Sequence, residues 1–375
     1  MKILFYVLLA IILLIVAFFF WFFVFHASVP ELEIPPSTDK TVRTEKIDRY
    51  LAGLQADGKF NGAVLIAREG APLLMKTYGF TDHTRATKLD TKSSFRLASV
   101  SKQFTAAGVL RAQQLGLLEI DNPVNDYLTG FPYAKVTVRH LLNQTSGVPD
   151  QYMQLAEAHR EEIGDTLSIN EVVELMTKYA PTVEGLPGDA YAYSNTGYVL
   201  LAAIVEATSG QSFEAFMQSQ LFDPLKMPQT RVLNHFSDTK NFPEKTAGFM
   251  QLPGLTDPLI PGFLDGVAGD GGVFSSIEDF LIWDEFWNGN NELVADSLLL
   301  QAFVSPTLND GAKSDYGFGW VLKPSGNHWH NGAWLGARTI IKRYPAQKEV
   351  IVILDNSDNI RFDKIAMAVI GGWEQ

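Results

Sequence analysis

Segments with strand character lie near both ends of the chain, and segments with helical spacing fill its middle. Gly62–Arg68 and Ala71–Tyr78 are short β-rich runs joined by a turn at Glu69-Gly70, which predicts a hairpin. Strand patterns return late in the chain, at Gly317–Lys323, His328–Gly332, Ala337–Tyr344 and Glu349–Asp355. This order predicts an α+β fold in which the terminal strands share one antiparallel sheet that is flanked by helices.

Helical periodicity dominates the part of the chain between these strands. The expected helices are Val42–Leu54, Phe104–Leu115, Thr137–Leu142, Ser168–Tyr179, Thr196–Thr208, Ser212–Phe222, Ile277–Trp287 and Asn359–Ile370. Several of them form a helical lobe, at about residues 120–261, that we expect to be inserted between the terminal strands. A cleft between a sheet and such a lobe is a natural place for a pocket.

The N-terminus begins with an uninterrupted apolar run of 23 residues, Ile3 to Phe25. About 20 such residues suffice to cross a bilayer, so we expect one transmembrane helix. Lys2 precedes the run, and Glu31 and Glu33 are the first charges after it. The positive-inside rule therefore predicts a cytoplasmic N-terminus and a domain on the periplasmic side of the inner membrane.

Three segments follow from this interpretation. Residues 1–26 are the expected signal anchor, residues 27–41 a stiff, proline-containing linker, and residues 42–375 one exported domain. A cleaved signal peptide and a buried core helix are the alternatives for the first segment.

Composition narrows the classes of function. The chain has no cysteine, so it forms no disulfide and carries no lipid on a cysteine. Its net charge is −12 and its basic residues are scattered, which argues against a nucleic-acid partner. The expected partners are therefore the membrane and a small-molecule or peptide substrate, and oligomeric state is left open.

Ser99 and Lys102 form the first candidate catalytic pair. They lie three residues apart where an apolar helix begins, so their side chains share one face. A serine hydroxyl needs a neighbouring group to take its proton, and a lysine held away from water can do so. The backbone N–H of Ser99, near the start of the helix, is a candidate donor to an oxyanion.

The Ser-x-x-Lys spacing alone is a weak signal, because Ser37–Lys40 and Ser237–Lys240 also match it. Ser37 follows two prolines, and Ser237 lies in a polar segment before Phe242 and Pro243. Both segments are typical of solvated loops. Only Ser99 opens an apolar helix that can bury a lysine.

Tyr193-Ser194-Asn195 is the second candidate cluster, and it is the only Tyr-x-Asn in the chain. A tyrosine whose hydroxyl approaches Lys102 can act as a general base, because a nearby cation favours its phenolate. Asn195 can exchange hydrogen bonds with a substrate carbonyl or amide. An asparagine at a helix start beside a packed tyrosine is the alternative.

The third cluster is His328-Trp329-His330-Asn331-Gly332-Ala333, on an expected strand. Two histidines at alternate positions share a face and could bind a metal, but further ligands with convincing spacing are missing, so we expect no metal and no cofactor. Gly332 would let a substrate approach closely, and the backbone N–H of Ala333 is the expected second oxyanion donor.

Gly269–Gly272 is interpreted as a turn rather than a phosphate loop, because Asp270 would repel phosphate.

The three clusters in this order resemble the serine β-lactamase and penicillin-binding protein superfamily, and most closely its class C β-lactamase-like esterases and peptidases. The resemblance covers about residues 62–354 and includes the flanking stretches Val138–Pro149 and Ala268–Ser276. It implies a β-lactamase/transpeptidase-like fold and a serine hydrolase that works through an acyl-enzyme.

The resemblance also implies roles for individual residues. Ser99 would be the acylated nucleophile, Lys102 its activating partner and Tyr193 the base for acylation and deacylation. The backbone of Ser99 and Ala333 would form the oxyanion hole. The residues expected to bind substrate are Asn195, His330, Asn331 and Gly332.

One departure from the family pattern bears on the substrate. Classical β-lactamases carry Lys-Thr-Gly where this chain has His330-Asn331-Gly332, so the ammonium and hydroxyl that would meet a β-lactam carboxylate are missing. We therefore expect an exported esterase or D-peptidase rather than an efficient β-lactamase. A D-alanyl-D-alanine peptidase or β-lactamase acting on cell-wall peptide or β-lactams, and a non-catalytic penicillin-binding sensor, are the alternatives.

Overall fold

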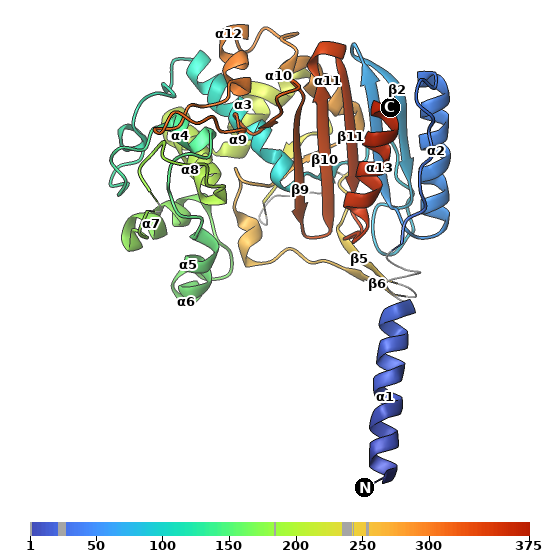
Figure 1. The fold of residues 1–375 in the computed structure, drawn as a ribbon. Coiled ribbons are helices and arrows are strands. Elements are labelled where there is room, and N and C mark those ends of the chain that lie inside the picture. Colours follow the sequence, from blue (N-terminus) through green and yellow to red (C-terminus); the bar gives the residue numbers. More distant parts are fainter. Residues whose placement is uncertain (1, 22–27, 184, 235–241, 243, 253–254) are drawn as a thin grey trace.

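The protein is described by a computed structural model that covers residues 2–21, 28–183, 185–234, 242, 244–252 and 255–375. Its largest sheet has six strands in the order β2-β1-β11-β10-β9-β8, and each neighbouring pair is antiparallel. The strands are β1 (Gly62–Arg68), β2 (Ala71–Tyr78), β8 (Val321–Leu322), β9 (His328–Trp334), β10 (Ala337–Tyr344) and β11 (Glu349–Asp355). The first and last strands are neighbours, which confirms the predicted α+β fold with one antiparallel sheet (Figure 1).

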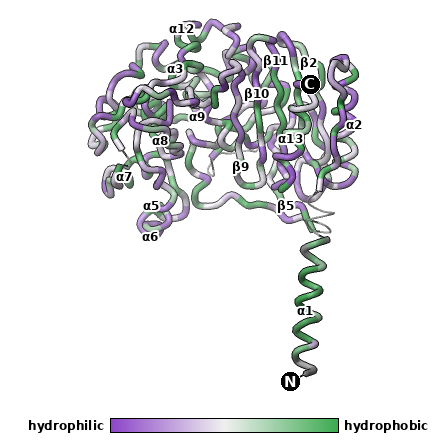
Figure 2. Tube along the Cα trace, viewed as in Figure 1, coloured by the Kyte–Doolittle hydropathy of each residue, from purple (hydrophilic) through white to green (hydrophobic). Residues whose placement is uncertain are grey.

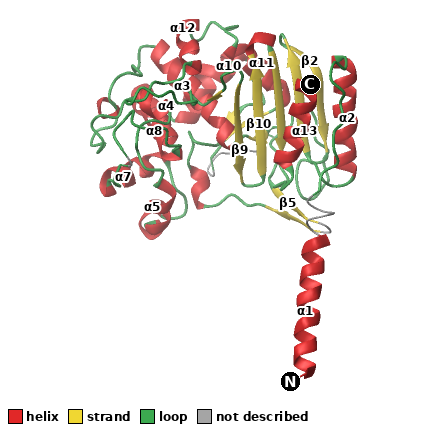
Figure 3. Ribbon diagram, viewed as in Figure 1, coloured by secondary structure: helices red, strands yellow, loops and turns green. Residues whose placement is uncertain are grey.

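Helices cover both faces of this sheet (Figure 3). Helices α2 (Lys40–Ala56) and α13 (Phe362–Glu374) pack on one face, and α11 (Ile277–Trp287) packs on the other. The alternation of side chains along β1 explains this arrangement. Val64 and Ile66 point into the core beneath α2 and α13, while Ala63 and Leu65 point into the core on the α11 side. Each fully buried valine, leucine or isoleucine side chain among them contributes about 1.5–3 kcal/mol.

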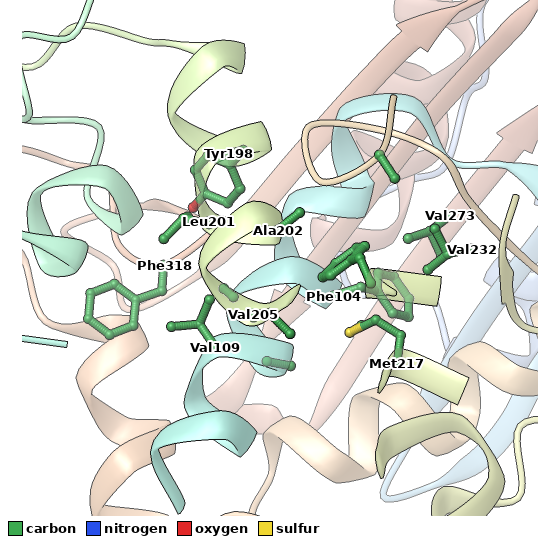
Figure 4. Close-up of a cluster of buried hydrophobic side chains, with 14 of the residues drawn as sticks. Phe104, Val109, Tyr198, Leu201, Ala202, Val205, Met217, Val232, Val273 and Phe318 are labelled. Atoms are coloured by element: carbon green, nitrogen blue, oxygen red, sulfur yellow. The ribbon is translucent and has the colours of Figure 1, made fainter. Parts of the chain in front are cut away.

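The helical part of the molecule lies beyond the β9 side of the sheet (Figure 1). Its helices are α3 (Ser101–Gln114), α4 (Val138–Leu142), α5 (Tyr152–Ala158), α6 (Arg160–Ile163), α7 (Ile169–Tyr179), α8 (Asn195–Ser209), α9 (Phe213–Met217), α10 (Asp223–Leu225) and α12 (Asp296–Leu299). Helices α3 and α8 are almost entirely buried and pack against each other, as the side chains of Phe104, Val109, Ala202 and Val205 show (Figure 4).

Several short elements were not predicted. A three-stranded sheet joins β3 (Phe95–Arg96), β7 (Val273–Ser275) and β4 (Arg231–Val232), and β5 (Phe249–Leu252) pairs with β6 (Leu255–Pro258). Short 3₁₀ helices occur at η2 (Ala98–Val100), η3 (Val124–Asp126), η5 (Phe263–Gly266), η6 (Leu300–Phe303) and η7 (Pro345–Gln347). Strands of two to four residues are too short to show a period of two in the sequence.

The structure corrects three expected elements. The strand predicted at Gly317–Lys323 is reduced to β8, because Gly319 adopts a φ of +76° in a turn before it. The last helix begins at Phe362 rather than at Asn359, whose side chain accepts the N–H of Arg361 at 3.0 Å. The helix predicted at Ser212–Phe222 breaks into α9, a π-helical turn at Gln218–Phe222, and α10. Pro224 fits the first turn of α10, because the N–H that proline lacks would have no partner within the helix there.

The N-terminal helix α1 (Lys2–Trp21) carries apolar side chains along its length (Figure 2). Within the part of the chain that the structure describes, no helix is both long and apolar enough to cross a membrane. The predicted transmembrane anchor is thus not supported by the structure, and residues 1 and 22–26 of it lie outside the described residues. The periplasmic location stays a prediction.

Candidate active site

Ser99 lies in the short helix η2, which contacts the six-stranded sheet at β9 and β10 and follows the residue that binds β7 of the three-stranded sheet. The residue before it, Ala98, has a φ of +48°, a left-handed conformation that is unfavourable for a residue with a side chain. The neighbouring backbone is anchored on both sides, because the N–H of Leu97 binds the carbonyl of Val273 at 2.9 Å and its carbonyl accepts the hydroxyl of Thr339 at 2.8 Å. Contacts to β7 and β10 thus hold Ser99 in place.

Lys102 lies one turn after Ser99 and is completely buried. Its Nζ lies 3.2 Å from Ser99 Oγ, 2.8 Å from Asn195 Oδ1 and 2.8 Å from the carbonyl oxygen of Asp270. These three neighbours match the three N–H donors of an ammonium. The distance to Ser99 is within the reach required of a group that exchanges a proton with the nucleophile.

Tyr193 lies beside this pair but differs from the expectation in its orientation. Lys102 Nζ lies 4.9 Å from the centroid of the Tyr193 ring, so the cation faces the ring. Among the described residues, no hydrogen bond joins the Tyr193 hydroxyl to Ser99 or Lys102. Because catalytic hydrogen bonds often tighten only when substrate binds, this geometry leaves the role of Tyr193 as a prediction.

Asn195 is the first residue of α8 and connects two elements of the site. Ser194 caps the helix, with its hydroxyl accepting the N–H of Gly197 at 3.1 Å. The Asn195 amide accepts from Lys102 through Oδ1 and donates through Nδ2 to Asp150 at 3.0 Å. Asn195 therefore fixes Lys102 as well as lining the cavity in which we expect substrate to bind.

Strand β9 passes directly over the nucleophile. A Cβ placed on Gly332 would lie 2.8 Å from the backbone nitrogen of Ser99 and 2.5 Å from the carbonyl oxygen of Leu97. Only a glycine permits this approach. Ser99 and Ala333 together line both cavities described below, which is where the two predicted oxyanion donors must meet a substrate carbonyl.

Two cavities have Ser99 in their walls. The first, of about 310 Å³, is lined by residues that include Arg96, Tyr152, Asn195, Asp265, Asp270 and Trp334. The second, of about 570 Å³, is lined by residues that include Tyr191, Tyr193, Asp315, Tyr316, Lys323 and His330. We call them the Asp270 cavity and the Tyr193 cavity.

His330 and Asn331 lie on β9 at the Tyr193 cavity. His330 Nδ1 is 2.6 Å from the carbonyl oxygen of Asn331 and must donate to it, so Nε2 accepts the hydroxyl of Tyr316 at 2.9 Å. Burial, with the charge of Lys102 as a further cause, lowers the pKa of His330 to about 3. His330 is therefore a neutral hydrogen-bonding group at physiological pH.

His328 lies apart from this site, stacked on Phe303 with 4.5 Å between the ring centroids. Burial, reinforced by the charge of Arg343, lowers the pKa of His328 to about 4. Within the described ranges, no group of three or more His, Cys, Asp or Glu side chains is arranged to hold a metal ion.

Sequence reasoning did not assign roles to several residues that the fold brings to the site. Asp150 accepts from Asn195 and from the N–H of Thr196 at 2.9 Å, and so anchors the start of α8. Asp270 holds Lys102 through its carbonyl, while its carboxylate accepts the hydroxyl of Tyr152 at 2.9 Å. A signal existed for Asp150, which directly follows the stretch Val138–Pro149, and for Asp270, which lies in the glycine-rich turn.

Of the other two Ser-x-x-Lys segments, Ser37–Lys40 is a turn that leads into α2, and Ser37 is exposed. Ser237–Lys240 lies outside the described residues. Ser99 is the member of the pattern that the structure places beside a buried lysine.

Comparison with known proteins agrees with this arrangement. A family model described as Beta-lactamase matches residues 47–369. Penicillin-binding protein 4* of Bacillus subtilis (strain 168) is 34% identical over 314 residues, which cover 80% of this chain and 69% of that protein. A D-aminopeptidase of Brucella anthropi is 28% identical over 287 residues, which cover 74% of this chain. This chain spans about half of that protein's length, 52%.

Solved structures show the same fold. The octameric penicillin-binding protein homologue from Pyrococcus abyssi has a TM-score of 0.73 at 23% identity, and the match covers 87% of this chain and 76% of that one. The family model spans most of this chain, and the Bacillus subtilis relative is similar over four fifths of it. The chain therefore belongs to the β-lactamase family, as a serine hydrolase related to the penicillin-binding proteins.

Proposed function

We propose that this hydrolase cleaves amides or esters of D-amino acids through an acyl-enzyme on Ser99. The observation that carries the proposal is the 3.2 Å contact between Ser99 Oγ and the buried Nζ of Lys102, at the junction of two cavities. A nucleophile beside a group that can exchange a proton with it, with space for both halves of a substrate, is the arrangement that acyl transfer requires.

In the proposed reaction, Ser99 Oγ attacks the substrate carbonyl carbon, and Lys102 relays the serine proton to Tyr193, releasing one proton to Tyr193 as it takes up the other. The carbonyl oxygen becomes negative and is bound by the backbone N–H groups of Ser99 and Ala333. The same proton passes to the departing amine or alcohol as the bond to the carbonyl carbon breaks. Water then attacks the acyl-enzyme and releases the acid, with the proton path reversed.

A D-amino acid substrate is supported by one relative, the Brucella anthropi protein that bears the name D-aminopeptidase. The class C-like assignment within the family rests on the sequence clusters alone, and we keep it as part of the proposal.

The state of His330 supports poor turnover of β-lactams. Where classical enzymes place an ammonium to meet the β-lactam carboxylate, this chain has a neutral imidazole engaged by Tyr316 and by a backbone carbonyl. The ammonium of Lys323 also lines the Tyr193 cavity, but its side chain is exposed and lies 5.7 Å from the ring centroid of Trp329. A solvated lysine is a weaker anchor for a carboxylate than a buried one.

Steady-state kinetics with four substrates test the proposed function. We expect hydrolysis of D-alanine p-nitroanilide to exceed that of its L-enantiomer by about tenfold or more, p-nitrophenyl acetate to be hydrolysed, and benzylpenicillin to be the slowest substrate. The Ser99→Ala variant is the control, and it should be inactive with all four. A folded protein that turns over none of them would contradict the proposal and favour a binding module, and preferential turnover of penicillin would indicate a β-lactamase.

A further inference from the structure

The two cavities have different roles if the proposed function holds, and the following inference rests on it. Both cavities are lined by Ser99 and Ala333, so a scissile carbonyl placed there has one substituent in each. Tyr193, which lies on the expected proton path, lines only the larger cavity. A departing group must receive its proton, so it occupies the Tyr193 cavity, and the acyl group occupies the Asp270 cavity.

The Asp270 cavity contains two carboxylates and one guanidinium. Asp265 is paired with Arg96 at 3.2 Å and accepts the indole N–H of Trp334 at 3.0 Å. Its second oxygen accepts the backbone N–H of Gly262 at 2.7 Å. The charge of Asp265 is thus balanced and its lone pairs are engaged by protein donors.

Asp270 differs from Asp265. Its carboxylate accepts a hydrogen bond from a neutral group, the hydroxyl of Tyr152, at 2.9 Å. Within the described part of the chain, no salt bridge includes Asp270. The Lys102 ammonium donates its hydrogen bonds to Ser99, Asn195 and the Asp270 carbonyl, and not to the Asp270 carboxylate.

The surroundings of Asp270 disfavour an unpaired negative charge. Burial raises the pKa of Asp270, the Lys102 charge opposes this, and the carboxylate of Asp150 adds to it. A second cation that entered the cavity would relieve this cost, because a buried carboxylate is stabilised by an opposite charge within hydrogen-bonding reach. The Tyr193 cavity has no such need, since one carboxylate and one ammonium, Asp315 and Lys323, both line it.

We propose that Asp270 binds an ammonium group on the acyl part of the substrate. The preferred acyl donors are then aminoacyl compounds with a free amine next to the scissile carbonyl, rather than N-acylated or purely aliphatic ones. Asp270 is a specificity residue in this account, and Tyr152 orients its carboxylate.

Two anilides that differ mainly in the amine test this proposal: D-alanine p-nitroanilide and propionic acid p-nitroanilide. Asp270→Asn keeps the size of the side chain, the hydrogen bond from the Tyr152 hydroxyl and the hydrogen bond from Lys102 to the backbone carbonyl of residue 270. It removes the negative charge of the carboxylate. We expect it to lower kcat/KM for the alanine anilide by about ten- to hundredfold, mainly through KM, and to leave the propionic anilide nearly unchanged. Asp315→Asn, the matched change in the other cavity, should leave the ratio of the two substrates unaltered.

A second readout does not depend on anilide turnover. D-alaninamide should protect Ser99 from a fluorophosphonate better than propionamide does, and Asp270→Asn should abolish the difference. Equal losses with both ligands would show a merely structural role for Asp270, and an unchanged ratio in Asp270→Asn would overturn the proposal. Failure of Ser99 to react with the fluorophosphonate at all would instead overturn the proposed function.

Discussion

Replacing Lys102 by methionine is expected to lower kcat/KM for an ester or anilide substrate by about 10²–10⁴-fold, the usual contribution of a positioned acid–base group. Methionine has a similar length but cannot exchange a proton with Ser99 Oγ, which lies 3.2 Å from Nζ. The loss should appear in kcat, because the residue contacts the reacting hydroxyl rather than the outer parts of the substrate.

Stability has to be measured alongside activity for this variant. The substitution leaves Asn195 Oδ1 and the Asp270 carbonyl without their donor, while it removes a fully buried amine. These effects oppose each other. Ser99→Ala is the matched control, since it abolishes the nucleophile and keeps both of those hydrogen bonds. A folded Lys102→Met protein with unchanged kcat would remove Lys102 from the proton path.

Replacing Gly332 by alanine is expected to destabilise the protein by about 1–3 kcal/mol and to reduce kcat/KM on the order of 10²-fold. The added Cβ would lie 2.5 Å from Leu97 O, 2.7 Å from Thr339 Oγ1 and 2.8 Å from Ser99 N, all below van der Waals contact. Two of the three obstacles are backbone atoms, so β9 and the Ser99 turn must separate. Thermal unfolding and steady-state kinetics measure the two effects.

Gly371→Ala in α13 is the control for this prediction. A Cβ there meets no atom within 4 Å, so alanine should stabilise the helix by up to about 0.5–1 kcal/mol and leave activity unchanged. If Gly332→Ala were as active and stable as Gly371→Ala, the close approach of β9 to Ser99 would be wrong.

The sequence predicts best where the signal is local. Ser99 and Lys102 are three residues apart, so their proximity follows from any helical turn, and the structure realises it with a 3₁₀ turn leading into α3. The hairpin of β1 and β2 is equally local, with Glu69 and Gly70 both at positive φ. That strands from both ends of the chain share one antiparallel sheet was predictable because β-rich runs lie at both ends, whereas the order of the strands was not predicted.

The remaining features of the site depend on contacts between distant parts of the chain. Asp150 lies 45 residues before Asn195, and Asp270 lies 168 residues after Lys102, so no spacing rule connects either pair. Gly319 shows the same limit, since its turn is required by the backbone of Gln103, whose nitrogen would lie 2.7 Å from a Cβ. The neutral state of His330 likewise follows from its burial against Tyr316, which the strand pattern does not reveal.

The measurement that tests the central claim most directly is the intact mass of the purified protein after incubation with a fluorophosphonate, compared among wild type, Ser99→Ala and Ser37→Ala. Ser37 begins another Ser-x-x-Lys segment and is exposed, so it controls for the motif without the site. We predict one adduct on wild type and on Ser37→Ala, and none on Ser99→Ala. An adduct that persists in folded Ser99→Ala, or a folded wild-type protein that forms none, would contradict the assignment of Ser99 as the nucleophile.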